Sequence, residues 1–169
     1  MTGNHAPGDQ ATVTVALAVT PARAFELFTE DIDIWWRRGP RFRSSASVRG
    51  MLFIEPGPGG RIFESEGDGA HETVFEIGRV SVWEPPHRLV FSWRAVNFAP
   101  DEATEVEALF EPGASGGTRL TVTHRGWSRI RLDHPVRHGH AEAKFIRVTA
   151  LWWADLMTAL REYATRAPL

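Results

Sequence analysis

The feature that most constrains this chain is a long helical stretch at its C-terminal end, from Ala141 to Arg166. The stretch contains neither Gly nor Pro, and Gly139 before it and Pro168 after it are typical of helix boundaries. Its apolar residues form one stripe of Phe145, Thr149, Trp152, Leu156, Ala159, Leu160 and Tyr163, and a second of Ile146, Ala150, Trp153 and Met157. Such a helix, about 39 Å long at 1.5 Å per residue, needs a large concave partner from the preceding residues.

Short β-rich runs separated by Gly- and Pro-containing turns fill the middle of the chain and predict an antiparallel meander. The predicted strands are Thr12–Val19, Ser47–Glu55, Arg61–Ser65, Thr73–Trp83, Arg88–Arg94, Thr104–Glu111 and Thr118–Trp127. In the later strands, apolar and polar residues alternate, so we expect one face of the sheet to be covered. The C-terminal helix is the expected cover, because nothing else in the chain has enough apolar area.

Two short helices are predicted after the first strand. Thr20 is a suitable N-cap and Pro21 a suitable first residue for the first helix. Glu30–Trp36 reads as the second helix, with acidic residues in its first turn, and Gly39 and Pro40 end it.

Composition narrows the class of protein. A chain of 169 residues with 43% hydrophobic residues fits one domain, predicted as residues 12–169 after a frayed segment of residues 1–11. The net charge of −2, with both signs mixed along the chain, favours neither nucleic acid nor an anionic membrane as a partner. The chain has no Cys, no apolar run of membrane-spanning length and no signal pattern in its opening residues, so we expect a cytoplasmic protein. No cofactor is predicted.

The order of elements resembles the helix-grip fold of the START-like, or SRPBCC, superfamily. It is most similar to the family named for homology to the activator of the heat-shock-protein-ninety ATPase. The stretches that carry the resemblance are Val19–Trp36, Pro58–Glu64, Gly78–Trp93, Phe110–Trp127 and the Trp-containing terminal helix. The resemblance implies an α+β fold with a curved antiparallel sheet of about seven strands, two short helices after strand one, and a long C-terminal helix across the concave face. It also implies a pocket between sheet and helix for an apolar or aromatic small molecule.

Alternation along the strands and spacing along the helix predict which residues line that pocket. The predicted ligand-binding residues are Trp35, Trp36, Phe91, Trp93, Ala108, Phe110, Val122, His124, Phe145, Thr149, Trp152 and Leu156. Aromatic walls suit a planar or hydrocarbon ligand. The alternative is that these residues form an ordinary packed core.

Two polar residues are candidates for catalysis. His124 continues the inward alternation of Leu120 and Val122, where an imidazole can transfer protons, but a hydrogen-bonded structural His is the alternative. Asp155 lies at the flank of the buried helix stripe, where a structural ion pair with an Arg is the alternative. The loop Ala95–Ala103 is either a lid over the pocket or a long hairpin.

A group of histidines and a run of arginines each have a functional and a structural interpretation. His134, His138 and His140 have a spacing that could gather around zinc, but Pro135 and Gly139 interrupt it, so a solvated entry to the helix is favoured and no metal is predicted. The basic run of Arg37, Arg38, Arg41, Arg43 and Arg49 is read as a solvated face rather than a phosphate site.

Three functions remain open. The favoured prediction is a cytoplasmic binding module for a hydrophobic or aromatic small molecule. The second is a cyclase- or dehydrase-like enzyme that uses His124 for proton transfer. The third is a co-chaperone-like domain that acts on a heat-shock-protein ATPase, through a chaperone or homodimer contact.

Overall fold

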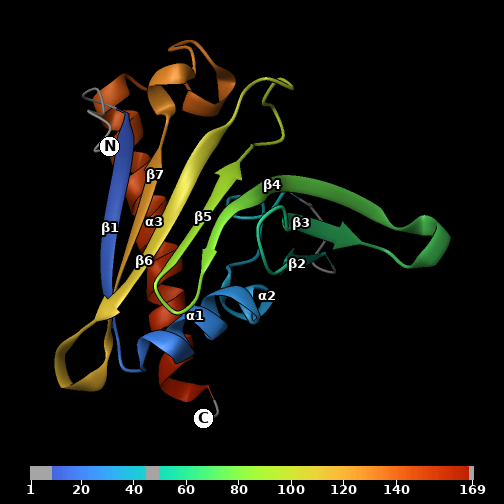
Figure 1. Ribbon diagram of the computed structural model, residues 1–169. Coiled ribbons are helices and arrows are strands. Elements are labelled where there is room, and N and C mark those ends of the chain that lie inside the picture. Colours follow the sequence, from blue (N-terminus) through green and yellow to red (C-terminus); the bar gives the residue numbers. More distant parts are fainter. Residues whose placement is uncertain (1–8, 45–49, 168–169) are drawn as a thin grey trace.

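The computed structural model describes residues 9–44 and 50–167. Within these residues, period-two alternation produces strands that form one antiparallel sheet in the order β1-β7-β6-β5-β4-β3-β2 (Figure 1). The strands are β1 (Gln10–Leu17), β2 (Met51–Ile54), β3 (Arg61–Glu66), β4 (Thr73–Glu84), β5 (Arg88–Trp93), β6 (Thr104–Pro112) and β7 (Thr118–Arg125). The curved sheet and the long C-terminal helix confirm the predicted α+β helix-grip fold.

The helices also follow the predicted order. They are α1 (Pro21–Thr29), α2 (Ile32–Trp35) and α3 (Glu142–Arg166), with short 3₁₀ turns at Gly69–His71, Ala114–Gly116, Trp127–Arg129 and Pro135–Arg137. The Thr20 side chain caps α1 by accepting a hydrogen bond from the Arg23 backbone N–H, as expected. α2 is shorter than the predicted Glu30–Trp36.

The bounds of β1 and the end of β7 differ from the prediction. β1 begins at Gln10, and Asp9 before it is buried, with hydrogen bonds from the backbone N–H groups of Gly126 and Ser128 offsetting the cost of burying its carboxylate. Residues 9–11, expected in the frayed segment, are therefore ordered, and residues 1–8 lie outside the described part. β7 ends at Arg125 rather than at residue 127, because Gly126 adopts a left-handed backbone conformation with φ 94°. The predicted start of β2 at residue 47 also lies outside the described residues.

α3 covers the concave side of the sheet along β1, β7 and β6 (Figure 1). Its buried residues are Phe145, Thr149, Trp153, Leu156, Met157, Leu160 and Ala164. The first predicted stripe is thus wrong at three places, because Trp152, Ala159 and Tyr163 are only partly buried. Trp153 and Met157 of the second stripe are buried instead, together with Ala164. A twisted sheet explains the difference, because the line of contact then winds slowly around the helix instead of following the ideal repeat.

The other end of the sheet extends beyond α3 as an arm, which consists of β2, β3 and the first half of β4 (Figure 1). β4 pairs with β3 through its first half and with β5 through its second half. Gly78 lies where the two halves meet, and a Cβ there would approach the Ser92 carbonyl oxygen to 1.7 Å. Glycine therefore permits the close strand contact at the base of the arm. Because the arm extends beyond α3, this helix does not cover the arm's inner face (Figure 1).

Apolar side chains from the sheet, α1, α2 and α3 form one main core. A smaller second core contains Phe98, Trp127, Ile130 and Phe145. Within residues 9–44 and 50–167, no helix combines the length and the apolar character that a membrane span needs.

Candidate functional site

The space between α3 and the middle of the sheet contains four tryptophan rings, which we call the tryptophan cluster: Trp36, Trp93, Trp152 and Trp153. Their ring centroids lie 5.2 to 5.9 Å apart in five pairs. Phe42 stacks on Trp152 from the loop after α2, at 5.9 Å. Offset and edge-to-face contacts at these distances are those of packed aromatic rings. The cluster therefore fills the centre of the region where a pocket is predicted.

The remaining predicted lining residues lie on the covered side of the sheet or under α3, as alternation predicts. All of the following are buried: Trp35, Phe91, Ala108, Phe110, Val122, Phe145, Thr149 and Leu156. Most of them belong to the main core, and Phe145 belongs to the second core. The structure brings them together as packed residues, and their contact with a ligand stays a prediction. Trp93 and Trp152 differ, because they are only partly buried.

His124 faces inward and is engaged through both ring nitrogens. The Trp153 indole N–H donates to Nδ1 at 3.1 Å, so Nε2 carries the proton and donates to Thr104 Oγ1 at 2.7 Å. The Thr104 hydroxyl in turn donates to the Trp93 carbonyl at 3.3 Å. The imidazole is 2% exposed, and burial lowers its pKa from 6.5 to about 3, so it is neutral at physiological pH. This geometry is that of a structural histidine, and His124 lines neither hollow described below.

Asp155 forms the ion pair that its helix position suggested. Its Oδ2 lies 2.8 Å from Arg41 Nη1, and its side chain is 46% exposed. The backbone carbonyl of Asp155 also accepts a hydrogen bond from Arg37 Nε at 3.0 Å. The residue thus fastens the loop after α2 to α3 and does not contact His124 in any hydrogen bond found between described residues.

Arginines of the basic run also hold the loop after α2, and not all of them are exposed to solvent. The Arg43 guanidinium is 4% exposed and pairs with Asp33 Oδ1 at 2.7 Å, which also accepts from the Leu52 backbone N–H. Arg38 pairs with Asp33 Oδ2 at 2.9 Å. Burial acts to raise the pKa of Asp33, but the hydrogen bonds from Arg43 and Leu52 outweigh it and hold the pKa below its usual value. Arg49 lies outside the described residues.

The histidines that precede α3 differ in their environments. His134 is buried, accepts from the Val136 backbone N–H at Nδ1, and contacts Glu102 Oε1 through Nε2 at 3.2 Å. His138 is exposed and ends the last 3₁₀ turn. Among residues 9–44 and 50–167, no group of three or more His, Cys, Asp or Glu side chains is arranged to hold a metal ion.

The loop Ala95–Ala103 is anchored in the second core. Phe98 contacts the ring of His134 at 5.3 Å and that of Trp127 at 6.3 Å. Val96, near the start of the loop, lines a hollow.

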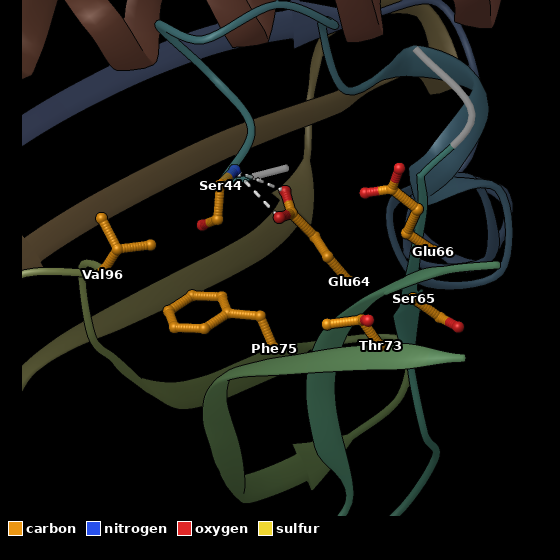
Figure 2. Close-up of a pocket in the computed structure, with 7 residues that line it drawn as sticks. All are labelled: Ser44, Glu64, Ser65, Glu66, Thr73, Phe75 and Val96. Atoms are coloured by element: carbon orange, nitrogen blue, oxygen red, sulfur yellow. Dashed lines mark hydrogen bonds between the residues drawn. The ribbon is translucent and has the colours of Figure 1, made fainter. Parts of the chain in front are cut away.

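That hollow has a volume of about 170 Å³ and lies on the inner face of the arm (Figure 2). Its lining comes from four segments: Ser44 after α2, Glu64, Ser65 and Glu66 of β3, Thr73 and Phe75 of β4, and Val96 after β5. Figure 2 shows the Glu64 carboxylate directed toward Ser44 and the Phe75 ring lying between Glu64 and Val96. Glu64 is 4% exposed, and both of its oxygens accept from the Ser44 backbone N–H, at 2.8 and 2.9 Å. We call this space the arm hollow.

Glu64 is a functional candidate that is not among the site residues predicted from the sequence. In β3, Ile62 and Glu64 occupy inward positions and are both buried, whereas Phe63 faces outward and pairs with Phe53 of β2. A glutamate that continues an apolar inward face is the signal that was available. Alternation in the later strands alone does not reveal this signal, because Glu64 lies in β3.

A second, more open hollow of about 530 Å³ lies between α2 and the C-terminal half of α3. It is lined by Ile34, Trp35, Trp36, Arg37, Arg38, Phe42, Ala159, Glu162 and Arg166. The indole N–H groups of Trp35 and Trp36 donate to the carbonyls of Leu27 and Phe42, so both donors are already used within the protein.

Comparison with known proteins gives the following matches. A model of the family described as Activator of Hsp90 ATPase homolog 1-like protein matches residues 18–163. The solved structure of an anthrahydroquino-gamma-pyrone synthase, Txn09, complexed with SUM, is 30% identical with a TM-score of 0.52, covering 91% of this chain and 99% of that one. DynU16, a protein of the dynemicin biosynthetic locus, is 20% identical with a TM-score of 0.64, covering 95% of this chain and 48% of its own.

The Aha1 dimer from Colwellia psychrerythraea is 15% identical with a TM-score of 0.58, covering 95% of this chain and 98% of that one. At 15% and 20% identity, these two likenesses show the fold alone. No curated protein matches the chain.

Proposed function

Since the chain belongs to the family of Activator of Hsp90 ATPase homolog 1-like proteins, we propose that it binds an aromatic small molecule in the arm hollow. The observation that carries this proposal is a hollow with an apolar wall, Phe75 and Val96, facing a buried carboxylate, Glu64. An apolar cavity of about 150 Å³ holds one benzene molecule. At about 170 Å³, the arm hollow accommodates roughly one aromatic ring.

Two partly buried rings come from the same chain segments as Ser44 and Val96 and could contact a larger ligand. Phe42 precedes Ser44 by two positions, and Trp93 precedes Val96 by three. Both rings contact Trp152, which is also only partly buried. A ligand with fused rings would occupy the hollow with one ring and lie along these side chains with the others. Trp93 and Trp152 are thus the predicted ligand-binding residues that such a ligand reaches first.

Deeper entry toward α3 requires the tryptophan cluster to move. Buried residues of the main core, such as Phe91, then contact only a ligand that displaces a ring of the cluster. This arrangement supports a ligand held between the arm and the loop after α2, at the edge of the space originally predicted between sheet and helix.

Binding is tested with a library of fluorinated aromatic compounds observed by ¹⁹F NMR, together with native mass spectrometry of freshly purified protein. Phe75→Ala should weaken binding of the selected compounds at least tenfold, because the ring forms the apolar wall. Phe53→Ala is the matched control, since Phe53 lies on the outer face of the same arm and pairs with Phe63. Equal affinities of both variants and the wild type would refute the location of the site.

A second candidate function is catalysis of ring closure, and it rests on Glu64 together with the 30% identity to a gamma-pyrone synthase. A buried carboxylate such as Glu64 can take a proton from a hydroxyl group as its oxygen attacks the β-carbon of a conjugated ketone. In this closure a C–O bond forms, and the carbon next to the ketone receives a proton, so the product is an isomer of the substrate. His124 is sealed in the core and Asp155 is paired with Arg41, so neither replaces Glu64 in this scheme.

Catalysis is tested with a 2-hydroxyaryl ynone, whose closure to a pyrone is followed by absorbance. Glu64→Gln should abolish any acceleration, whereas Asp155→Asn should retain it, because the Asp155 side chain is half exposed and lies in a surface ion pair. Equal rates with protein and with buffer would exclude this activity for that substrate class.

A further inference from the structure

The hollow of about 530 Å³ between α2 and the C-terminal half of α3, which we call the basic hollow, is lined by more cations than anions. Three of its nine lining residues are arginines, Arg37, Arg38 and Arg166, and only Glu162 is acidic. This excess is local, because the chain as a whole has a net charge of −2. A cationic lining attracts anions and repels cations.

Neighbouring carboxylates compensate only part of this charge. Asp33 pairs with Arg38 at 2.9 Å, but it also pairs with Arg43 at 2.7 Å and is therefore shared between two guanidinium groups. Within the part of the chain that the structure describes, neither Arg37 nor Arg166 belongs to an ion pair. Both can therefore pair with an anion without first giving up a carboxylate.

Arg37 is held in place although its charge is not paired. Its Nε donates to the backbone carbonyl of Asp155 at 3.0 Å, which fixes the guanidinium against α3. The Asp155 carboxylate itself pairs with Arg41. The planar guanidinium fork matches the oxygens of a carboxylate or a phosphate, and a side chain that is already positioned loses less freedom when it binds.

The α3 residues of the basic hollow form one stripe along the helix. Ala159, Glu162 and Arg166 follow Asp155 at steps of four, three and four residues, which places all of them on one face. Arg37 contacts the first residue of this stripe, and Arg166 is the last. The two unpaired arginines therefore lie toward opposite ends of the hollow, with Glu162 between them along the helix.

Apolar side chains line the same space. Ile34 is 65% exposed, and Phe42 and Ala159 are partly buried. An inorganic anion gains only the attraction of the arginines, whereas an anion with an apolar part also removes apolar surface from water.

We propose that the basic hollow binds an organic oxyanion, a carboxylate or phosphate joined to an apolar group. Arg37 contacts the oxygens of this anion, and Arg166 attracts it from the other end of the stripe. Glu162 opposes the anion and limits its affinity. The basic hollow shares no lining residue with the arm hollow, so this site goes beyond the binding function proposed above and does not depend on it.

The test measures dissociation constants of 4-fluorobenzoate, 4-fluorophenyl phosphate and the neutral isostere 4-fluorobenzamide by ¹⁹F NMR titration. We expect at least one of the two anions to bind about tenfold more tightly than 4-fluorobenzamide, because hydrogen bonds between charged groups are the stronger ones. The tighter anion identifies the oxyanion that the hollow prefers. Inorganic phosphate should compete more weakly than either aryl anion, because it gains no apolar contact.

Three variants locate the site. Arg37→Gln should weaken binding of the preferred anion about tenfold, because it removes the contact with the oxygens. Arg166→Gln should weaken it about twofold to threefold, the effect of one exposed charge. Arg161→Gln is the matched control, since Arg161 is exposed on the same half of α3 and does not line the hollow, and it should leave the affinity unchanged.

Glu162→Gln makes the opposite prediction and does not disturb the loop after α2. Glu162 is exposed, and its replacement should tighten binding of the preferred anion about twofold to threefold. This variant decides the matter if Arg37→Gln does not fold, because unchanged or weaker binding would contradict a site beside Glu162.

The outcomes separate this proposal from the function proposed above. Equal binding of the anions and 4-fluorobenzamide would overturn the basic hollow as an anion site. Equal losses in Arg37→Gln and Arg161→Gln would show a general attraction by surface charge and would also overturn it. Anion binding that is lost in Phe75→Ala and kept in Arg37→Gln would assign the anion to the arm hollow instead, which supports the earlier proposal and refutes this one.

Discussion

The buried neutral state of His124 predicts that acid destabilises this fold well before its carboxylates are protonated. The imidazole is 2% exposed and hydrogen-bonded to Trp153 and Thr104 inside the core. Its pKa is lowered from 6.5 to about 3 in the folded chain. Between these two values, the unfolded chain binds a proton that the folded chain does not bind. The stability is therefore fully present above the unfolded pKa and is lost as the pH falls toward 3.

The size of the effect follows from the two pKa values. One pKa unit corresponds to about 1.4 kcal/mol. Lowering the pH from about 7.5 to about 5.0 crosses roughly 1.5 units below the unfolded pKa, which predicts a loss of about 2 kcal/mol from His124 alone. Against a total stability of about 5–15 kcal/mol for a domain, that loss is large enough to measure.

Urea unfolding followed by tryptophan fluorescence at the two pH values measures this loss. His124→Gln removes the titrating group while keeping a polar side chain, and His87→Gln is the control, because His87 is exposed. The wild type and His87→Gln should both lose about 2 kcal/mol more than His124→Gln over this pH range. If His124→Gln shows the same pH dependence as the wild type, then His124 is not a buried neutral histidine and the reasoning is refuted.

Urea unfolding also tests three other contacts. Trp153→Ala should lower the free energy of unfolding by about 3–5 kcal/mol, because Trp153 is 1% exposed. Trp152→Ala should lower it by about half as much or less, because Trp152 is only partly buried. Equal losses would contradict the assignment of the buried stripe. Arg43→Met should lower the free energy of unfolding by about 3–5 kcal/mol, because Asp33 loses its buried partner. The double variant Arg43→Met with Asp33→Asn should lose less than the sum of the two single variants. Strict additivity would argue against an energetic contribution of the ion pair. Thr20→Ala should cost about 1 kcal/mol through loss of the α1 cap, and an unchanged midpoint would show that the cap contributes nothing.

The position of His124 illustrates how far alternation predicts a site. The alternation of apolar and polar residues correctly predicts that the His124 side chain points inward, because successive residues of a strand point to opposite faces of the sheet. It did not show that Trp153 and Thr104 would hold both ring nitrogens, because these partners come from α3 and from β6. Which groups meet across the core depends on how elements dock, which local spacing does not contain.

Arg43 and Glu64 show the same limit for charged residues. Composition favours a solvated face for the basic run over a phosphate site, because the chain as a whole is slightly acidic. In the structure, Asp33 pairs with Arg43 and anchors the Leu52 backbone, so the charge is compensated by residues distant in the sequence. Glu64 similarly gains its Ser44 partner only when the loop after α2 folds against the arm.

The sequence by itself determined the order of the elements, the cap of α1, the alternation of the strands and the need for a long helix to cover the sheet. These features depend on spacing and on turn residues, which are local. Only the tertiary structure decided that Trp153 rather than Trp152 is buried, that tryptophan rings fill the centre of the expected pocket, and that the hollow lies on the arm beside Glu64. These outcomes depend on the twist of the sheet and on how rings of fixed size pack between layers, and both arise only when the elements meet.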